Sequence, residues 1–343
     1  MPPSATTGVP LAPLTTLRLG GLAAKVVEAH TDDDLVDVLR ACDAAGEPVL
    51  VLAGGSNVVI ADEGFAGTVV RVLTHGVERD GTALSVAAGE PWDEVVAAAV
   101  DDGLAGIECL SGIPGSTGAT PIQNVGAYGQ DVAQTVTSAR VYDRRRDAVG
   151  DLPAEALGFA YRTSALRYQD RRVVLRVRFD LTASDMSGPL RYAELARAVG
   201  ADRAPLHDVR DAVLELRRGK GMVVDPDDPD SVSAGSFFTN PILEPEAFEA
   251  LARRGAGEPP RFPEAGGRVK TSAAWLIERA GFHKGDTRGS VGISTKHSLA
   301  LINRGGATTA ELVAFAREIA DGVRERFGVA LHPEPIFVGH DWR

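Results

Sequence analysis

Three short segments carry side chains suited to proton transfer or to binding an anion. Arg162, in the run YRTS, is always charged, and its fork of donors suits a carboxylate or a developing negative charge. Ser236 follows Gly235 and precedes two phenylalanines. This pattern predicts a tight turn in a partly dry pocket, where a hydroxyl can protonate a carbanion or enolate. Glu334 stands between two prolines, which fix its backbone.

Each segment also has a plainer interpretation, and the residues alone leave both open. Arg162 would be a surface arginine in a turn, Ser236 a part of a buried turn, and Glu334 a solvated acid. A serine nucleophile is disfavoured, because the Gly-x-Ser-x-Gly elbow of hydrolases is absent and no Asp/His pair lies near Ser236 in the sequence.

A first glycine-rich loop follows a hydrophobic strand. Gly54 and Gly55 allow a tight turn whose N–H groups face a pyrophosphate, and Ser56 and Asn57 add donors. The loop matches neither the G-x-G-x-x-G motif nor the P-loop motif, and a plain hairpin turn would explain it equally well.

A second glycine-rich loop, residues 112–129, is more specific. A structural loop rarely needs so many small residues together with a Gln-Asn pair and an aromatic side chain. Backbone N–H groups of Gly115, Ser116 and Thr117 suit phosphate oxygens, and Gln123 and Asn124 suit the edge of a flat polar ring. This loop therefore predicts a cofactor site.

The runs AGGSNVVI and GIPGSTGATPIQNVGAYG together resemble the FAD-binding domain of the UDP-N-acetylenolpyruvoylglucosamine reductases. That domain has the broad fold of the vanillyl-alcohol-oxidase-type flavoproteins. The resemblance implies FAD held by both loops, without a covalent bond because neither loop contains His or Cys. The implied cofactor-binding residues are Gly54, Gly55, Ser56, Asn57, Gly115, Ser116, Thr117, Gln123, Asn124, Gly126, Ala127 and Tyr128.

The resemblance runs from about residue 15 to 339 and also covers the three reactive segments. It implies that Arg162 binds the substrate carboxylate, that Ser236 is the general acid, and that Glu334 acts with the arginine at the enolate. The implied reaction is the NADPH-driven reduction of UDP-N-acetylglucosamine enolpyruvate to UDP-N-acetylmuramate in peptidoglycan synthesis. Hydride would pass from reduced flavin N5 to C3, and a proton from Ser236 to C2.

Substrate-binding positions carry over from the same resemblance. Tyr192 resembles the tyrosine that closes over the nucleotide in the longer class of these reductases. Thr239 and His297 depart from the pattern, because several relatives have lysine at the first and some have glutamine at the second. The implied substrate-binding residues are Tyr161, Tyr192, Arg217, Lys220, Asn240, Lys270 and His297.

Two other functions share part of this pattern. A flavin oxidase of the same broad fold would have the loops, but it gives no reason for Arg162, Ser236 and Glu334 together. Rapid reoxidation by air without the nucleotide would favour it. A nonenzymatic nucleotide-binding protein would have no need to keep all three reactive residues.

Charge and composition narrow the partners. The net charge of −11 argues against nucleic acid, and the longest basic run, residues 144–146, predicts a surface turn. Cys42 and Cys109 lack metal-site spacing and are expected to be structural thiols, with no metal bound. No signal peptide or membrane-length apolar run is present, so we expect a cytoplasmic protein with no membrane partner. We also expect a monomer, although no feature of the sequence indicates the oligomeric state.

Helices and strands must position these residues. Capping residues and apolar spacing predict helices over 31–46 and 91–103 and within the runs TSAAWLIERAG and TAELVAFAREIADGVRERFG, and residues 189–219 read as helical. Strands are expected at 24–29, 68–73, 83–88, 136–142 and 173–181 and in PIFVG. The irregular order favours an α+β multidomain protein, and the Pro/Asp-rich run VVDPDDPDS is the best boundary. The expected parts are 1–74 with 328–343, then 75–225, both for FAD, and 226–327 for the UDP-sugar.

Overall fold

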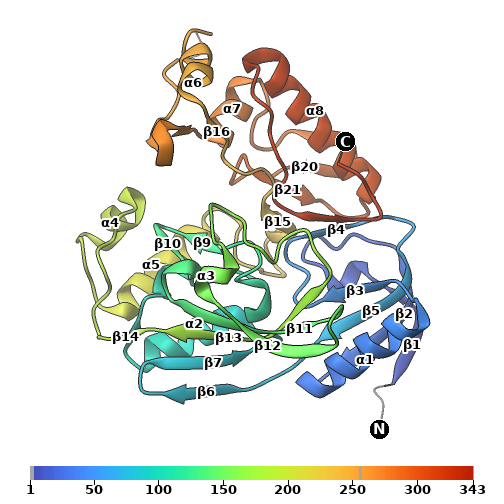
Figure 1. Ribbon diagram of the computed structural model, residues 1–343. Helices are drawn as coiled ribbons and strands as arrows, with labels where there is room; N and C mark the ends of the chain where they lie inside the picture. Colours follow the sequence, from blue (N-terminus) through green and yellow to red (C-terminus); the bar gives the residue numbers. More distant parts are fainter. Residues whose placement is uncertain (1–3, 255–256, 343) are drawn as a thin grey trace. The chain divides into compact units, whose positions relative to one another are not determined.

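The computed structural model describes residues 4–254 and 257–342, which form two compact units (Figure 1). The first unit comprises the described residues of Met1–Pro10, Leu22–Gly55 and Phe65–Gly219, and the second those of Leu11–Gly21, Ser56–Gly64 and Lys220–Arg343. The first glycine loop is divided between them after Gly55. The three-part division expected from the sequence stays a prediction.

The first unit contains a mixed sheet of β1 (Ala5–Pro10), β2 (Leu22–Ala29), β5 (Phe65–Val72) and β3 (Val49–Leu52), in that order. Strand β1 is antiparallel to β2, whereas β5 runs parallel to both β2 and β3. Most of β5 is buried, as is typical of a central strand that is covered on both faces.

Helix α1 (Asp32–Ala45) lies beside this sheet (Figure 1). Its N-terminus has a capping box, in which Thr31 and Asp34 satisfy each other's backbone N–H groups. Its C-terminus is Gly46, at φ 65°, a conformation that glycine adopts without strain. The predicted helix is confirmed, and its buried residues are Leu35, Val36, Leu39 and Cys42.

A second, fully antiparallel sheet consists of β12 (Ala148–Pro153), β11 (Val136–Asp143), β13 (Arg172–Asp180), β7 (Ala83–Ala87) and β6 (Val77–Asp80), in that order. Helix α2 (Trp92–Asp101) packs on its core, where the rings of Trp92 and Phe179 lie 5.6 Å apart. These elements confirm the strands and the helix that the sequence predicts in this region.

The region 189–219 is two helices rather than one continuous helical stretch. Helix α4 (Ala193–Val199) ends at Gly200, which has φ 79°. Helix α5 (Leu206–Arg218) begins after Pro205, because proline lacks the N–H that an interior helical position needs. The short elements of this unit are β8 (Leu104–Ala105), β9 (Gly126–Ala127), β10 (Gln130–Asp131), α3 (Ala154–Leu157) and β14 (Thr182–Ala183).

The second unit contains an antiparallel sheet of β15 (Ser233–Ser236), β21 (Ala300–Asn303), β20 (Val291–Ile293) and β19 (Thr287–Arg288). Helix α8 (Thr309–Phe327) packs on β20 and β21 and also contacts α7 (Ala273–Arg279). A capping box between Thr308 and Glu311 begins α8, and Gly328 ends it. Both predicted helices of this unit are confirmed.

Shorter strands and one helix complete the second unit. Strand β22 (Ile336–Val338) is the predicted PIFVG strand and runs parallel to β4 (Val58–Ile60). A small sheet contains β16 (Ile242–Leu243), β18 (Val269–Lys270) and β17 (Phe262–Pro263), and α6 (Pro245–Ala252) follows β16.

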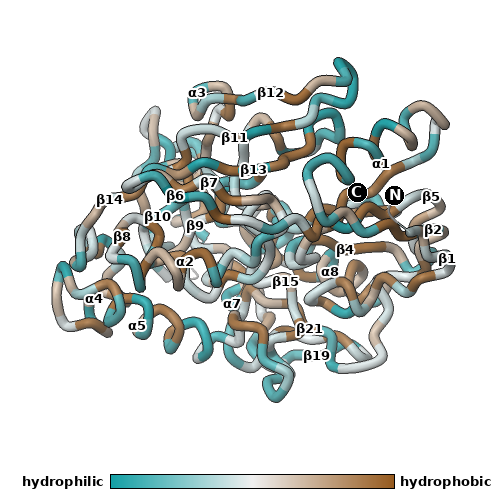
Figure 2. The backbone as a smooth tube through the Cα atoms, turned by 90° about the horizontal axis from the view of Figure 1, so that it is seen from below, coloured by the Kyte–Doolittle hydropathy of each residue, from teal (hydrophilic) through white to brown (hydrophobic). Residues whose placement is uncertain are grey.

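The hydropathy of the backbone follows this packing. In Figure 2 the tube changes between brown and teal along α1 and α5, as expected for helices with one buried and one solvated face. None of the helices in the described ranges combines the length and the apolar character that crossing a membrane would require.

Candidate active site

The two glycine loops approach each other closely in the first unit. A Cβ atom added to Gly54 would lie only 2.7 Å from the Cα of Gly115. Backbone therefore meets backbone, and no side chain fits at position 54. Gly55 and Gly115 have φ angles of 60° and 115°, which favour glycine. Such a stretch of backbone without side chains fits the pyrophosphate of a flavin dinucleotide.

Backbone hydrogen bonds tie the second loop to α2 and the segment before it. The N–H of Trp92 donates to the carbonyl of Gly115 at 3.0 Å, and the N–H of Thr117 donates to that of Glu90 at 2.8 Å. Since the N–H of Thr117 is engaged in this way, the N–H groups of Gly115 and Ser116 are the better phosphate donors of the three that the sequence suggests.

Asn124 has a scaffolding role that the sequence does not indicate. Its side-chain NH2 group donates to the carbonyl of Ala160 at 3.1 Å, and its side-chain oxygen accepts from the N–H of Ala133 at 3.1 Å. The residue is buried and has φ 49°. Its amide therefore joins the glycine loop to two neighbouring segments, whereas the sequence suggests that it bonds a flat ring.

Arg162 lies against this loop. Its Nη1 donates to the carbonyl of Asn124 at 3.3 Å, and its Nη2 donates to that of Gly126 at 2.5 Å. The residue is half-buried and has φ 54°, an uncommon backbone conformation for a residue other than glycine. A strained backbone that brings a guanidinium to a predicted cofactor loop favours the functional interpretation over a surface turn.

Two tyrosines and a buried arginine also lie at this loop. The rings of Tyr128 and Tyr192 meet edge to face, with centroids 5.4 Å apart. Burial raises the pKa of Tyr128 to about 12, although the charge of Arg217 opposes the shift. Burial lowers the pKa of Arg217 itself to about 10. Two rings and a cation suit an aromatic and anionic ligand such as a nucleotide.

Asp93 anchors the start of the second loop, and sequence reasoning missed it. Its carboxylate accepts from the N–H of Gly112 at 2.6 Å and takes two hydrogen bonds from Arg210, at 2.7 and 3.0 Å. Burial raises the pKa of Asp93, but the hydrogen bonds from Arg210 and Gly112 outweigh burial and leave the pKa below its ordinary value. In the sequence Asp93 is only an acid in a helix's first turn, and nothing there indicates these partners.

The second unit brings Ser236 and Glu334 together. Ser236 ends β15, directly after Gly235, which has φ 69°. The next residue, Phe237, donates its N–H to the carbonyl of Leu299 at 2.7 Å and accepts the N–H of Glu334 at 2.8 Å. Both predicted catalytic residues of this unit are half-buried. One backbone ladder therefore carries the hydroxyl and the carboxyl.

Asn57 joins the same ladder. Its side chain donates to the carbonyl of Glu334 at 3.3 Å, and its own carbonyl accepts the N–H of Ile336 at 3.0 Å. Ser56 accepts a hydrogen bond from the hydroxyl of Thr16 at its carbonyl. The second half of the first glycine loop is thus fixed beside the segment that carries Glu334.

The other predicted substrate residues of the second unit lie on separate loops and strands. Asn240 accepts the N–H of Ala273 at 2.9 Å, and Lys270 forms an ion pair with Glu264. His297 follows β20 and donates its N–H to the hydroxyl of Ser294. Lys220 lies two residues after the end of α5.

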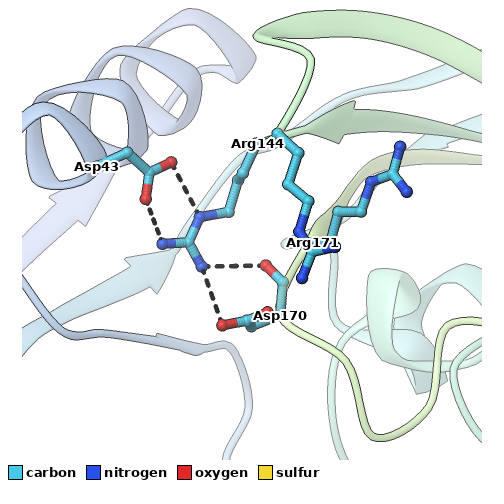
Figure 3. A pocket seen from close by; sticks show the side chains of 5 residues that line it. Asp43, Arg144, Asp170 and Arg171 are labelled. Atoms are coloured by element: carbon cyan, nitrogen blue, oxygen red, sulfur yellow. Dashed lines mark hydrogen bonds and ion pairs between the residues drawn. The ribbon is translucent and has the colours of Figure 1, made fainter. Parts of the chain in front are cut away.

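A charged surface hollow of the first unit contains none of the predicted site residues. Its volume is about 210 Å³, and it is lined by Asp43, Arg144, Arg145, Asp170 and Arg171. Arg144 donates twice to Asp43 and once to the carbonyl of Asp170 (Figure 3). These ion pairs link α1 to the turn after β11, which confirms the predicted turn and gives the hollow a structural role.

The remaining ionisable groups point to no metal site. Cys42 and Cys109 are free and buried, and burial raises the pKa of both thiols. Among the described residues, no group of three or more His, Cys, Asp or Glu side chains is placed to hold a metal ion.

Two protein families match separate parts of the chain. Residues 23–147 match the FAD binding domain, and residues 227–338 match the C-terminal domain of UDP-N-acetylenolpyruvoylglucosamine reductase. These matches, together with the mixture of helices and strands, confirm the predicted fold class. The chain is an α+β multidomain protein with an FAD-binding domain and a C-terminal α+β domain.

Proteins similar to this chain extend over nearly its whole length. UDP-N-acetylenolpyruvoylglucosamine reductase of Thermobifida fusca is 57% identical over 96% of this chain and 97% of that protein. The protein of the same name from Streptomyces coelicolor is 56% identical over 96% of this chain and 89% of that protein. The crystal structure of UDP-N-acetylenolpyruvylglucosamine reductase from Thermus caldophilus has a TM-score of 0.68 and 25% identity, and it covers 98% of both chains.

Proposed function

The chain belongs to the UDP-N-acetylenolpyruvoylglucosamine reductases, and from this premise we propose that it reduces UDP-N-acetylglucosamine enolpyruvate to UDP-N-acetylmuramate with NADPH. It is an oxidoreductase with an FAD-binding domain, and its family acts in peptidoglycan synthesis. The observation that supports the proposal is the backbone ladder in which Glu334 bonds to Phe237, the residue that follows Ser236.

The glycine loops would hold FAD. Gly54, Gly55, Gly115 and Ser116 would bind its pyrophosphate through backbone N–H groups, since the close approach of Gly54 to Gly115 leaves backbone alone at this point. When bound, FAD would supply the chemistry of hydride transfer between NADPH and the enolpyruvyl group.

Arg162 would bind the carboxylate of the enolpyruvyl group. Its guanidinium is already oriented by the carbonyls of Asn124 and Gly126, so that little side-chain freedom remains to be lost on binding. A fixed positive charge at the carboxylate stabilises the enolate that develops when hydride reaches C3.

Ser236 would donate the proton to C2. Its half-buried position limits competing water, and a basic carbanion or enolate makes the serine hydroxyl an adequate acid. Glu334 would act with Arg162 at the enolate. A bare carboxylate would repel an enolate, so this role requires the protonated acid or an intervening water.

The nucleotide would be held by charged and aromatic side chains. Tyr192 and Arg217, near Tyr128, suit its base and its phosphates. Tyr161, Lys220, Asn240, Lys270 and His297 complete the proposed substrate-binding set. A monomeric, cytoplasmic enzyme stays a prediction from the sequence.

The position of the transferred proton tests the proposal. Turnover in D2O should give UDP-N-acetylmuramate with deuterium at C2, because the serine hydroxyl exchanges its proton with solvent. The product is identified by mass spectrometry and the label located by NMR. Protium at C2, or no saturated product, would contradict the proposed reaction.

A further inference from the structure

Four aromatic rings of the second unit form one cluster, consisting of Phe237, Phe238, Phe337 and Trp342. The ring of Trp342 contacts the other three, with centroid distances of 6.4, 5.9 and 5.7 Å in that order. Phe237 also contacts Phe238 and Phe337, at 5.2 and 6.3 Å. Phe237 and Phe238 are buried completely, so the cluster is a packed part of the core.

This cluster supports the segments that carry Ser236 and Glu334. Phe237 and Phe238 directly follow Ser236, and Phe337 lies in β22, three residues after Glu334. The two segments are joined by the hydrogen bond from the N–H of Glu334 to the carbonyl of Phe237. The N–H of Thr239 donates to the carbonyl of His332 in the same ladder, at 3.0 Å.

The backbone around Trp342 is held by a side chain of α8. Arg317, on the solvent-facing side of α8, donates from Nε to the carbonyl of Trp342 at 3.0 Å and from Nη2 to that of Asp341 at 2.6 Å. The guanidinium thus ties the backbone that bears Trp342 to a long, well-capped helix.

We propose that Trp342 is a positioning residue for the reduction, because its ring fixes the backbone of Ser236 relative to that of Glu334. The inference rests on the proposed function, in which Ser236 donates the proton. Trp342 contacts rings on both sides of the ladder, so its loss lets the two segments shift against each other. Displacements of about 1 Å at a catalytic group cost up to about 100-fold in rate.

The first experiment compares Trp342→Ala with a matched control. Trp275 lies in the same hydrophobic core, where its ring packs on Phe327 at 5.8 Å and outside the aromatic cluster. With FAD-loaded protein reduced by NADPH, Trp342→Ala should slow reoxidation by the enolpyruvyl nucleotide by about tenfold or more. Trp275→Ala should cause no comparable loss, and reduction by NADPH should be unchanged in both variants.

Two gentler variants guard against simple misfolding. Trp342→Phe keeps an aromatic ring in the cluster and should recover most of the rate. Arg317 is exposed on α8, and Arg317→Gln removes its two hydrogen bonds to the carbonyls of Asp341 and Trp342. Arg317→Gln should also slow reoxidation by the enolpyruvyl nucleotide, as Trp342→Ala does. A normal reoxidation rate in Trp342→Ala would overturn the proposal.

Amide hydrogen exchange supplies a readout besides activity. The N–H groups of Phe237, Thr239 and Glu334 form the ladder, so peptides that contain them should exchange faster in Trp342→Ala than in Trp275→Ala. Equal exchange rates of these peptides in the two variants would overturn the proposal, because the loss of Trp342 would then not have loosened the ladder.

Ser236→Ala separates failure of this proposal from failure of the proposed function. If Trp342 acts through Ser236, adding Trp342→Ala to Ser236→Ala should slow reoxidation far less than it does in the wild-type background. A fully additive loss would overturn the positioning role alone. Normal reoxidation in Ser236→Ala would overturn the acid role itself, and the proposal with it.

Discussion

A serine hydroxyl is a poor acid in water, so the proposed role of Ser236 depends on its surroundings. The residue is half-buried at the end of β15, and the following residue, Phe237, bonds to Glu334 in the backbone ladder. The basicity of an enolate and a fixed geometry are the two conditions under which such a hydroxyl transfers a proton efficiently.

Replacing Ser236 by alanine should therefore separate the two halves of the reaction. Because a positioned acid contributes about 10²–10⁴-fold, reoxidation of the reduced protein by the enolpyruvyl nucleotide should fall by that factor. Bleaching by NADPH should be normal. Stopped-flow absorbance at the flavin bands measures both steps, and an equal loss of both would refute the assignment.

The carboxylate of Asp143 provides a pH-dependent contribution to stability. Hydrogen bonds from Arg171 lower the pKa of Asp143 from 3.8 to about 2. A carboxylate with a lowered pKa in the folded state stabilises the fold above its unfolded pKa, and this contribution disappears as the pH falls toward the folded pKa.

Asp143→Asn should accordingly unfold at a lower temperature than the wild type at pH 7. The difference in unfolding temperature between the variant and the wild type should disappear between about pH 4 and pH 2, where the wild-type carboxylate becomes protonated. Asp151→Asn controls for the removal of a charge, since Asp151 lies 3.8 Å from Arg140 at an exposed position. A gap independent of pH over this range would show that the ion pair does not carry the effect.

At the scale of elements, the two glycine loops of the first unit meet with no room for a side chain between them. A methyl group at position 54 would lie 2.7 Å from the Cα of Gly115, and backbone cannot rotate away as a flexible side chain can. Overpacking of this kind costs about 1–3 kcal/mol.

Gly54→Ala should weaken FAD binding by roughly 5- to 150-fold, since every 1.4 kcal/mol corresponds to about a factor of ten. Titration of the apoprotein with FAD, followed by flavin fluorescence, measures the dissociation constant. Gly150→Ala is the control, because a Cβ at Gly150 in β12 meets nothing within 4 Å. Wild-type affinity in Gly54→Ala would mean that the loops do not form the pyrophosphate site.

Most helices and strands could be predicted from local signals in the sequence. Thr31 and Gly46 mark the ends of α1 in the sequence as they do in the structure. The pattern of residues 189–219 indicates helix without showing the break between Gly200 and Pro205, although both residues are recognisable helix breakers. Boundaries were harder to predict than the presence of an element.

In the candidate site, the residues within local motifs were predictable from the sequence, whereas those defined by long-range contacts were not. Arg162, Ser236 and Glu334 could be singled out because their motifs are local. The hydrogen bonds of Asp93 to Gly112 and Arg210, and the contacts of Trp342, join residues far apart in sequence. No spacing rule indicates them, because only the folded chain determines which side chains meet.

At the scale of the whole molecule, the chain has a net charge of −11 and is proposed to bind an anionic nucleotide. Positively charged side chains at the site must therefore outweigh the negative electrostatic potential of the whole protein. Arg217 is buried beside Tyr128, and Arg162 is oriented by two carbonyls, so positive charge is placed at particular points within an acidic protein.

The central claim is that this family member oxidises NADPH and reduces the enolpyruvyl nucleotide in two separable steps. The visible spectrum of the purified protein, recorded without oxygen, tests it most directly. The account predicts flavin bands that bleach on addition of NADPH and return only when UDP-N-acetylglucosamine enolpyruvate is added. A protein that cannot be loaded with FAD, or bleached bands that the nucleotide fails to restore, would contradict it.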